Sequence, residues 1–129
     1  MRKHIIADIQ AHAAAEYPRE CCGLLLAMGL AQKYFPCKNI ATEPSEEFRL
    51  DPEDYAAAED LGEVIGIVHS HPDATSRPSP HDLAMCEATA LPWHILSWPE
   101  GDMRTITPTG STPLLKRPLC LLYTSDAAA

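Results

Sequence analysis

One short segment constrains the fold of this chain more than any other. Residues 64–70 read Val-Ile-Gly-Ile-Val-His-Ser, an apolar run rich in β-branched side chains. Such a run is typical of a β-strand. It ends in His69-Ser70-His71, and because side chains alternate along a strand, both imidazoles are expected on the same face.

The remaining segments predict helices and further strands around this one. Asp51 followed by Pro52 is typical of a helix start, because Asp caps the free N–H groups and Pro is tolerated in the first turn. The order is helix, hairpin, helix, strand, helix, hairpin, which predicts an α/β (α+β) fold with helices packed against a mixed or antiparallel sheet. We expect helices at 2–16, 51–61 and 79–89, strands at 21–28, 32–36, 92–98 and 104–107, and a brief strand at 48–50.

Length and charge narrow the functional classes. The 129 residues fit one domain, which we place at 1–110, with 111–129 as a linker and an unstructured or non-native tail. A net charge of −8 argues against nucleic acid as a partner. No apolar run is long enough to span a membrane and no signal peptide is evident, so we expect a cytoplasmic protein. The five cysteines are odd in number, which favours reduced thiols.

The negative charge is concentrated between residues 43 and 60, where acidic side chains far outnumber the single Arg49. A solvated acidic face explains this stretch most simply. A docking surface for a basic partner is the alternative, and the sequence leaves both open.

A metal site is the chemistry that the histidine pair suggests. Asp82 follows His71 by eleven residues, at the expected start of a helix. Two imidazoles and one carboxylate leave a fourth tetrahedral position open, as in catalytic zinc sites. Zinc lowers the pKa of a coordinated water to about 7. Taken singly, each half has a plainer explanation: His-x-His pairs occur at strand ends without metal, and Ser79 with Asp82 forms a capping box. Together, at this spacing, they predict a metal centre.

The same residues carry a family resemblance. His69-Ser70-His71-Pro72, a six-residue spacer, and then Ser79-x-x-Asp82 resemble the JAMM motif of the MPN+ (Mov34/PAD-1) zinc metallopeptidases. Glu20 stands where that family places an upstream glutamate. The resemblance implies a JAB/MPN-like fold, with His69, His71 and Asp82 as Zn²⁺ ligands. It also implies Glu20 as general acid/base, Ser79 as a hydrogen-bond donor to the oxyanion, and hydrolysis of a peptide or isopeptide bond.

Other candidate residues are interpreted as structural. His81 lies beside the motif but has no ligand position in it, and we expect it to be solvated. Cys21 and Cys22 adjoin Glu20, but their apolar strand favours buried, inert thiols over nucleophiles. The remaining histidines and the tryptophans are expected in packing or surface positions: His4, His12, His94, Trp93 and Trp98.

Within the prokaryotic JAB group, the chain resembles the N-terminal half of phage tail assembly proteins of the lambda K type. That resemblance implies phage tail proteins or peptidoglycan peptides as substrates or partners, and a fused or separate NlpC/P60 cysteine peptidase domain. Two alternatives stay open. One is a stand-alone JAB hydrolase that trims a ubiquitin-like or sulfur-carrier protein, and the other is a non-catalytic MPN scaffold.

Overall fold

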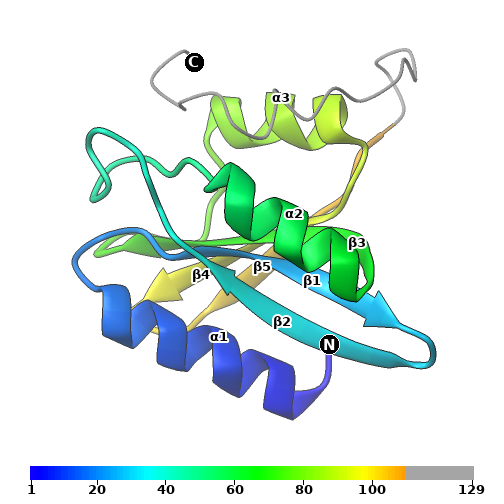
Figure 1. Cartoon of the computed structure of the whole chain (residues 1–129). Helices are drawn as coiled ribbons and strands as arrows, with labels where there is room; N and C mark the ends of the chain where they lie inside the picture. Colours follow the sequence, from blue (N-terminus) through cyan, green and yellow to red (C-terminus); the bar gives the residue numbers. More distant parts are fainter. Residues whose placement is uncertain (110–129) are drawn as a thin grey trace.

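A five-stranded sheet with helices on both faces forms the molecule in the computed structural model, which describes residues 1–109 (Figure 1). The strand order is β2-β1-β3-β4-β5; β3 and β4 are parallel, and the other neighbours are antiparallel. This mixed sheet confirms the predicted fold class. The tail predicted at 111–129 lies outside the described residues. The elements are α1 (Lys3–Glu16), β1 (Cys22–Met28), β2 (Ala31–Cys37), α2 (Pro52–Leu61), β3 (Glu63–Pro72), α3 (Pro80–Thr89), β4 (Trp93–Trp98) and β5 (Met103–Ile106).

Two sequence expectations differ from the structure. The brief strand predicted at 48–50 is wrong, since only Leu50 pairs, in an isolated bridge to Asn39. Phe48 and Leu50 are apolar because they enter the core, and their burial does not require a ladder. The central strand is also longer than expected. It continues through Pro72, because the last two residues of β3 pair with the end of β4.

Helix α1 covers one face of the sheet (Figure 1). Its buried residues are Ile5, Ile9 and Ala13, spaced four apart, so they form a single stripe. That stripe packs on side chains that point to the same face of the sheet, among them Leu25, Tyr34, Val68 and Leu96. None of the helices described combines the length and apolar composition that crossing a bilayer requires.

Helices α2 and α3 lie on the opposite face, which carries the larger core (Figure 1). Asp51 caps α2 as predicted: its side chain accepts the N–H of Glu53 at 3.0 Å. Tyr55 and Ala58 of α2 and Cys86 of α3 then pack on alternate strand residues, which include Leu24, Leu26, Ile67 and Trp93. His69 has the same parity as Ile67, so its ring also faces this side.

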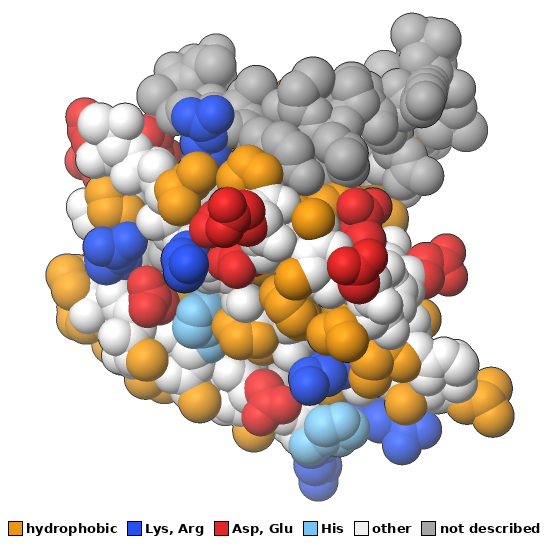
Figure 2. Space-filling view, in the orientation of Figure 1, with side chains coloured by type: hydrophobic (Ala, Val, Ile, Leu, Met, Phe, Trp, Pro, Cys, Tyr) orange, Lys and Arg blue, Asp and Glu red, His pale blue; other side chains and the backbone are white. Residues whose placement is uncertain are grey.

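The acidic stretch does not form a uniform patch on the face seen in Figure 2. Acidic side chains lie over the region of α2, with basic and hydrophobic side chains between them. Part of this charge is structural. Besides capping α2, Asp51 lies 3.8 Å from the ammonium of Lys38, and the backbone N–H of Lys38 donates to Asp54 at 2.7 Å.

His94 makes stability sensitive to acid. Its Nδ1 lies 2.8 Å from the Thr105 hydroxyl, and burial, together with the positive N-terminus, lowers the pKa of His94. The native state therefore disfavours the charged imidazole. The contribution of neutral His94 to the free energy of unfolding is complete above a pH of about 6.5, the pKa of histidine in the unfolded chain. It is lost as the pH falls toward the lower pKa that His94 has in the folded protein. We expect His94→Gln to flatten the decline in unfolding free energy between pH 7.5 and 5.5, measured by urea denaturation. Parallel pH profiles for the two proteins would contradict this.

Candidate metal centre

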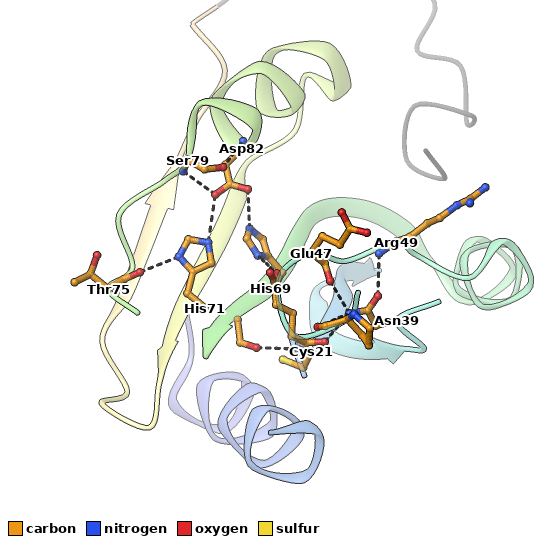
Figure 3. Close-up of polar contacts among 12 residues, drawn as sticks. Cys21, Asn39, Glu47, Arg49, His69, His71, Thr75, Ser79 and Asp82 are labelled. Atoms are coloured by element: carbon orange, nitrogen blue, oxygen red, sulfur yellow. Dashed lines mark hydrogen bonds and ion pairs between the residues drawn. The ribbon is translucent and has the colours of Figure 1, made fainter. Parts of the chain in front are cut away.

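Three predicted ligands converge at one end of the central strands. His69 and His71 project from β3 toward α3, and Asp82 lies on the first turn of α3 (Figure 3). His69 Nε2 lies 3.3 Å from Asp82 Oδ1, and His71 Nε2 lies 3.3 Å from Asp82 Oδ2. One potential ligand atom from each residue lies within 4.8 Å of the others. The geometry is compatible with a single metal ion bound by two imidazoles and a carboxylate.

Asp82 has two roles in the structure. It is the third residue of α3 in a capping box: Ser79 Oγ accepts the Asp82 N–H at 3.0 Å, and the Ser79 N–H donates to Asp82 Oδ2 at 2.9 Å. The capping box and the ligand position, which are alternative explanations at the level of sequence, therefore coexist. Burial alone raises the pKa of Asp82, but the adjacent His69 and His71 imidazoles outweigh it and hold that pKa well below its usual range. The carboxylate is thus charged at neutral pH.

His69 lies in an aromatic slot. Its ring stacks on Phe48 with a centroid distance of 4.6 Å, and it meets Trp93 edge-on at 5.6 Å. Burial lowers the pKa of His69, but the Asp82 and Glu20 carboxylates on either side outweigh this and raise it to about 10.

The His69 Nε2 atom supports the assignment of the cluster to a metal. This nitrogen is buried and makes no hydrogen bond of good geometry in the part of the chain that is described. A buried polar atom without a partner is costly. A cation between the two imidazoles and Asp82 would provide that partner, so the donor set fits zinc, which prefers nitrogen and carboxylate ligands.

Glu20 approaches the centre from outside the ligand cluster. It precedes β1, is 6% exposed, and places Oε1 3.2 Å from His69 Nδ1, on the opposite side of the ring from Asp82. Its N–H donates to the carbonyl of Pro44 at 2.6 Å, and its own carbonyl accepts from the side chain of Asn39 at 3.0 Å. Glu20 is therefore outside the candidate ligand cluster of His69, His71 and Asp82. The close contact with His69 was not foreseen.

A pocket of about 500 Å³ opens over these residues. Besides the metal cluster and Glu20, Ser79 and His81 reach it, so His81 contributes to the pocket wall and is half-buried, not fully solvated. The end of β3 and the loops on either side supply the rest of the lining: Ser45, Glu46, Glu47, Pro72 and Ala74.

The cysteines beside Glu20 are unsuited to nucleophilic chemistry. Cys21 and Cys22 are both fully buried. Burial raises the pKa of Cys21 to about 11 and that of Cys22 well above its ordinary value. A nucleophilic cysteine requires a thiolate near neutral pH, so both thiols are structural, as the sequence predicts.

Several residues that shape the site carry no recognisable signal in the sequence. The carbonyl of Thr75 contacts His71 Nδ1 at 2.8 Å, and any residue type supplies a carbonyl. Asn39 organises the loop behind Glu20, where its amide donates to the Glu47 carbonyl and accepts the N–H of Arg49 at 3.0 Å (Figure 3). The exposed loop around it offers no pattern that singles out this asparagine.

Comparison with known families agrees with the geometry. Residues 2–108 match the family described as prokaryotic homologs of the JAB domain. The chain belongs to this family. The match covers every described element of this JAB domain and all of its candidate metal ligands.

Two relatives of this JAB domain carry names that refer to a role. Tail tip assembly protein K of Escherichia phage N15 is 63% identical over 121 residues, which are 94% of this chain and 50% of that protein. The chain thus spans about half the length of the phage relative. A protein of Haloferax volcanii named desampylase is 32% identical over 117 residues. The aligned region covers 84% of this chain and 84% of that protein.

Solved structures share the fold. A protein of Desulfitobacterium hafniense has a TM-score of 0.63 and 29% identity, covering 81% of this chain and 77% of that one. A JAB1/MPN domain protein of Archaeoglobus fulgidus has a TM-score of 0.52 and 22% identity, with 81% and 83% coverage. The second likeness concerns the fold alone, and it confirms the JAB/MPN architecture that the motif predicts.

Proposed function

We propose that this chain is a zinc-dependent hydrolase that cleaves a peptide or isopeptide bond. The observation that carries the proposal is the convergence of His69, His71 and Asp82 on one point of a pocket that Glu20 also lines. A zinc ion held there would supply Lewis acidity and lower the pKa of a coordinated water to about 7. Three protein ligands leave a coordination position for that water, which is the pattern of catalytic zinc sites.

Glu20 is the proposed general acid/base. It is the carboxylate in the pocket that lies next to a ligand without belonging to the ligand cluster. In this role it would accept a proton from the attacking water and donate it to the leaving amine.

Ser79 is the proposed hydrogen-bond donor to the oxyanion. Its Oγ accepts the Asp82 N–H and lines the pocket. A hydroxyl that accepts one hydrogen bond still has its own hydrogen to donate. The capping box that fixes Ser79 on α3 therefore leaves it free to stabilise negative charge that develops on the substrate.

The proposed biological role is in phage tail assembly, in the cytoplasm of the host cell. The 63% identity to a tail tip assembly protein supports it. Phage tail proteins or peptidoglycan peptides are then the proposed substrates, and a fused or partner NlpC/P60 domain remains a proposal of the same kind. The second candidate is a hydrolase that trims a ubiquitin-like or sulfur-carrier protein, supported by the similarity to the protein named desampylase.

A cleavage screen tests the proposal. The full chain, loaded with zinc, is incubated with peptidoglycan stem peptides, with phage tail proteins, and with a ubiquitin-like protein joined to a peptide. We expect cleavage in one class, abolished by a chelator and restored by zinc, as read by mass spectrometry. Asp82→Asn is the matched control and is expected to show no cleavage. It removes the charged ligand, but its amide oxygen can still accept the Ser79 N–H and so preserve the helix cap. Cleavage that survives the chelator, or no cleavage in any class, would contradict the proposal.

A further inference from the structure

One hydrogen bond determines which nitrogen of His71 faces Asp82. Nδ1 lies 2.8 Å from the carbonyl oxygen of Thr75 (Figure 3). A carbonyl can only accept, so Nδ1 carries a proton and donates it to Thr75. Nε2 is then the ring nitrogen left to face the metal cluster, and it lies 3.3 Å from Asp82 Oδ2. The position of the Thr75 carbonyl therefore sets the orientation of the ring and which nitrogen faces Asp82.

Thr75 lies between Ala74 and Ser76, and both of these residues form hydrogen bonds with the hairpin of β4 and β5. On one side, the hydroxyl of Ser97 donates to the carbonyl of Ala74 at 2.8 Å. On the other, the hydroxyl of Ser76 donates to the carboxylate of Asp102 at 2.5 Å. Ser76 and Ser97 are each 1% exposed. Buried hydroxyls are costly to leave unpaired, so these two bonds fix the loop on both sides of the carbonyl that His71 contacts.

The sheet places the hairpin within reach of this loop. In the parallel ladder of β3 and β4, His71 pairs with Ser97 and Pro72 with Trp98. The loop that leaves β3 begins over the end of β4, where the N–H of Asp73 donates to the carbonyl of Trp98 at 2.7 Å. The turn after β4 then brings Asp102 back toward Ser76.

We propose that Asp102 is a positioning residue for the metal ligand His71. Its carboxylate accepts a hydrogen bond from Ser76 and so fixes the position of that residue. Ser76 follows Thr75 in the chain, so it also fixes the Thr75 carbonyl that orients the imidazole. The bond between Asp102 and Ser76 is charge-assisted and so stronger than a neutral one. Without Asp102, the Ser76 hydroxyl is left buried with no acceptor and the loop must shift to satisfy it. The inference rests on the proposed function only in taking His71 as a zinc ligand.

Zinc affinity measures the effect on the ligand. In competition with a chromophoric chelator, using the full chain, we expect Asp102→Ala and Ser76→Ala each to weaken zinc binding about 10- to 100-fold. Asp102→Asn keeps an oxygen acceptor and is expected to bind nearly as tightly as wild type. Thr105→Ala is the matched control, because it removes a hydroxyl from the same hairpin. That hydroxyl contacts His94 Nδ1 and not the loop that carries Thr75. This variant is expected to leave zinc affinity unchanged.

The double variant tests whether the two residues act in series. Asp102→Ala with Ser76→Ala should weaken zinc binding no more than either single change, because both break one bond. Losses that multiply would overturn the inference, as would a folded Asp102→Ala protein with wild-type affinity.

A second readout does not depend on metal. Nitrogen-15 NMR of the His71 ring in metal-free protein should show an Nδ1–H that is hydrogen-bonded and exchanges slowly with water in wild type, and that exchanges faster in Asp102→Ala. If wild type binds no zinc, the proposed function fails while this spectrum still decides the role of Asp102. An Nδ1–H that exchanges equally slowly in Asp102→Ala would overturn the inference.

Discussion

Asp82→Ala is expected to abolish zinc binding, while wild-type protein purified without added metal should contain about one zinc per chain. Asp82 is the single carboxylate among the described candidate ligands, and it lies 3.3 Å from the Nε2 atom of each histidine. Without it, two neutral imidazoles remain, and zinc loses its anionic ligand. Metal content by mass spectrometry measures the result, with His71→Ala expected to behave in the same way.

The stability of the same variant separates the two roles of Asp82. Zinc at 100 times its Kd should raise the unfolding free energy of wild type by about 2.7 kcal/mol and leave that of Asp82→Ala unchanged. Loss of the capping box should cost about 1 kcal/mol even without metal. Asp82→Asn keeps an acceptor for the Ser79 N–H, so it should lose the zinc increment while retaining most of the cap. A full complement of zinc in both variants would show that the cluster is not the metal site.

Glu20→Gln is expected to lower kcat by about 10² to 10⁴ with little change in zinc content or KM. Glutamine matches glutamate in size and can still accept a hydrogen bond from His69 Nδ1, but it cannot take up a proton from water. The measurement is the steady-state rate on whichever substrate the cleavage screen identifies, with zinc affinity determined in parallel.

Measuring zinc affinity matters because the structure allows Glu20 a second role. A carboxylate that accepts from the far nitrogen of a metal-bound histidine orients that ring and strengthens binding, and Glu20 Oε1 lies 3.2 Å from His69 Nδ1. A purely orienting Glu20 would show its main effect in zinc affinity. Full turnover by Glu20→Gln would contradict the acid/base role of Glu20.

The ligand cluster was predictable because its spacing is short and its side chains are distinctive. Alternation along β3 places His69 and His71 on one face, and Ser79 marks the start of α3 as a capping residue. The helix and strand positions followed from the same local rules of periodicity and capping. The brief strand expected at Phe48 was wrong, because burial of an aromatic side chain indicates a core position and not a backbone conformation.

The rest of the site depends on contacts between segments distant in sequence. The stacking of Phe48 on His69 joins residues 21 positions apart, and the bond between Ser76 and Asp102 joins residues 26 positions apart. Neither pair has a motif, since serine and aspartate are common in turns for local reasons. The orientation of the His71 ring depends on a backbone carbonyl, which no residue type encodes.

The three candidate metal ligands lie on one crossover, the connection from β3 through α3. This placement affects how a domain of this kind can change in evolution. His69, His71 and Asp82 lie within 14 consecutive residues, along the connection from β3 through α3. Glu20 comes from the other side of the first hairpin, 49 residues before His69. Substitution, duplication or exchange of either segment therefore leaves the other intact. Under the proposed function, a descendant that retains the crossover and replaces Glu20 would lose turnover in one step and still keep the candidate metal ligands.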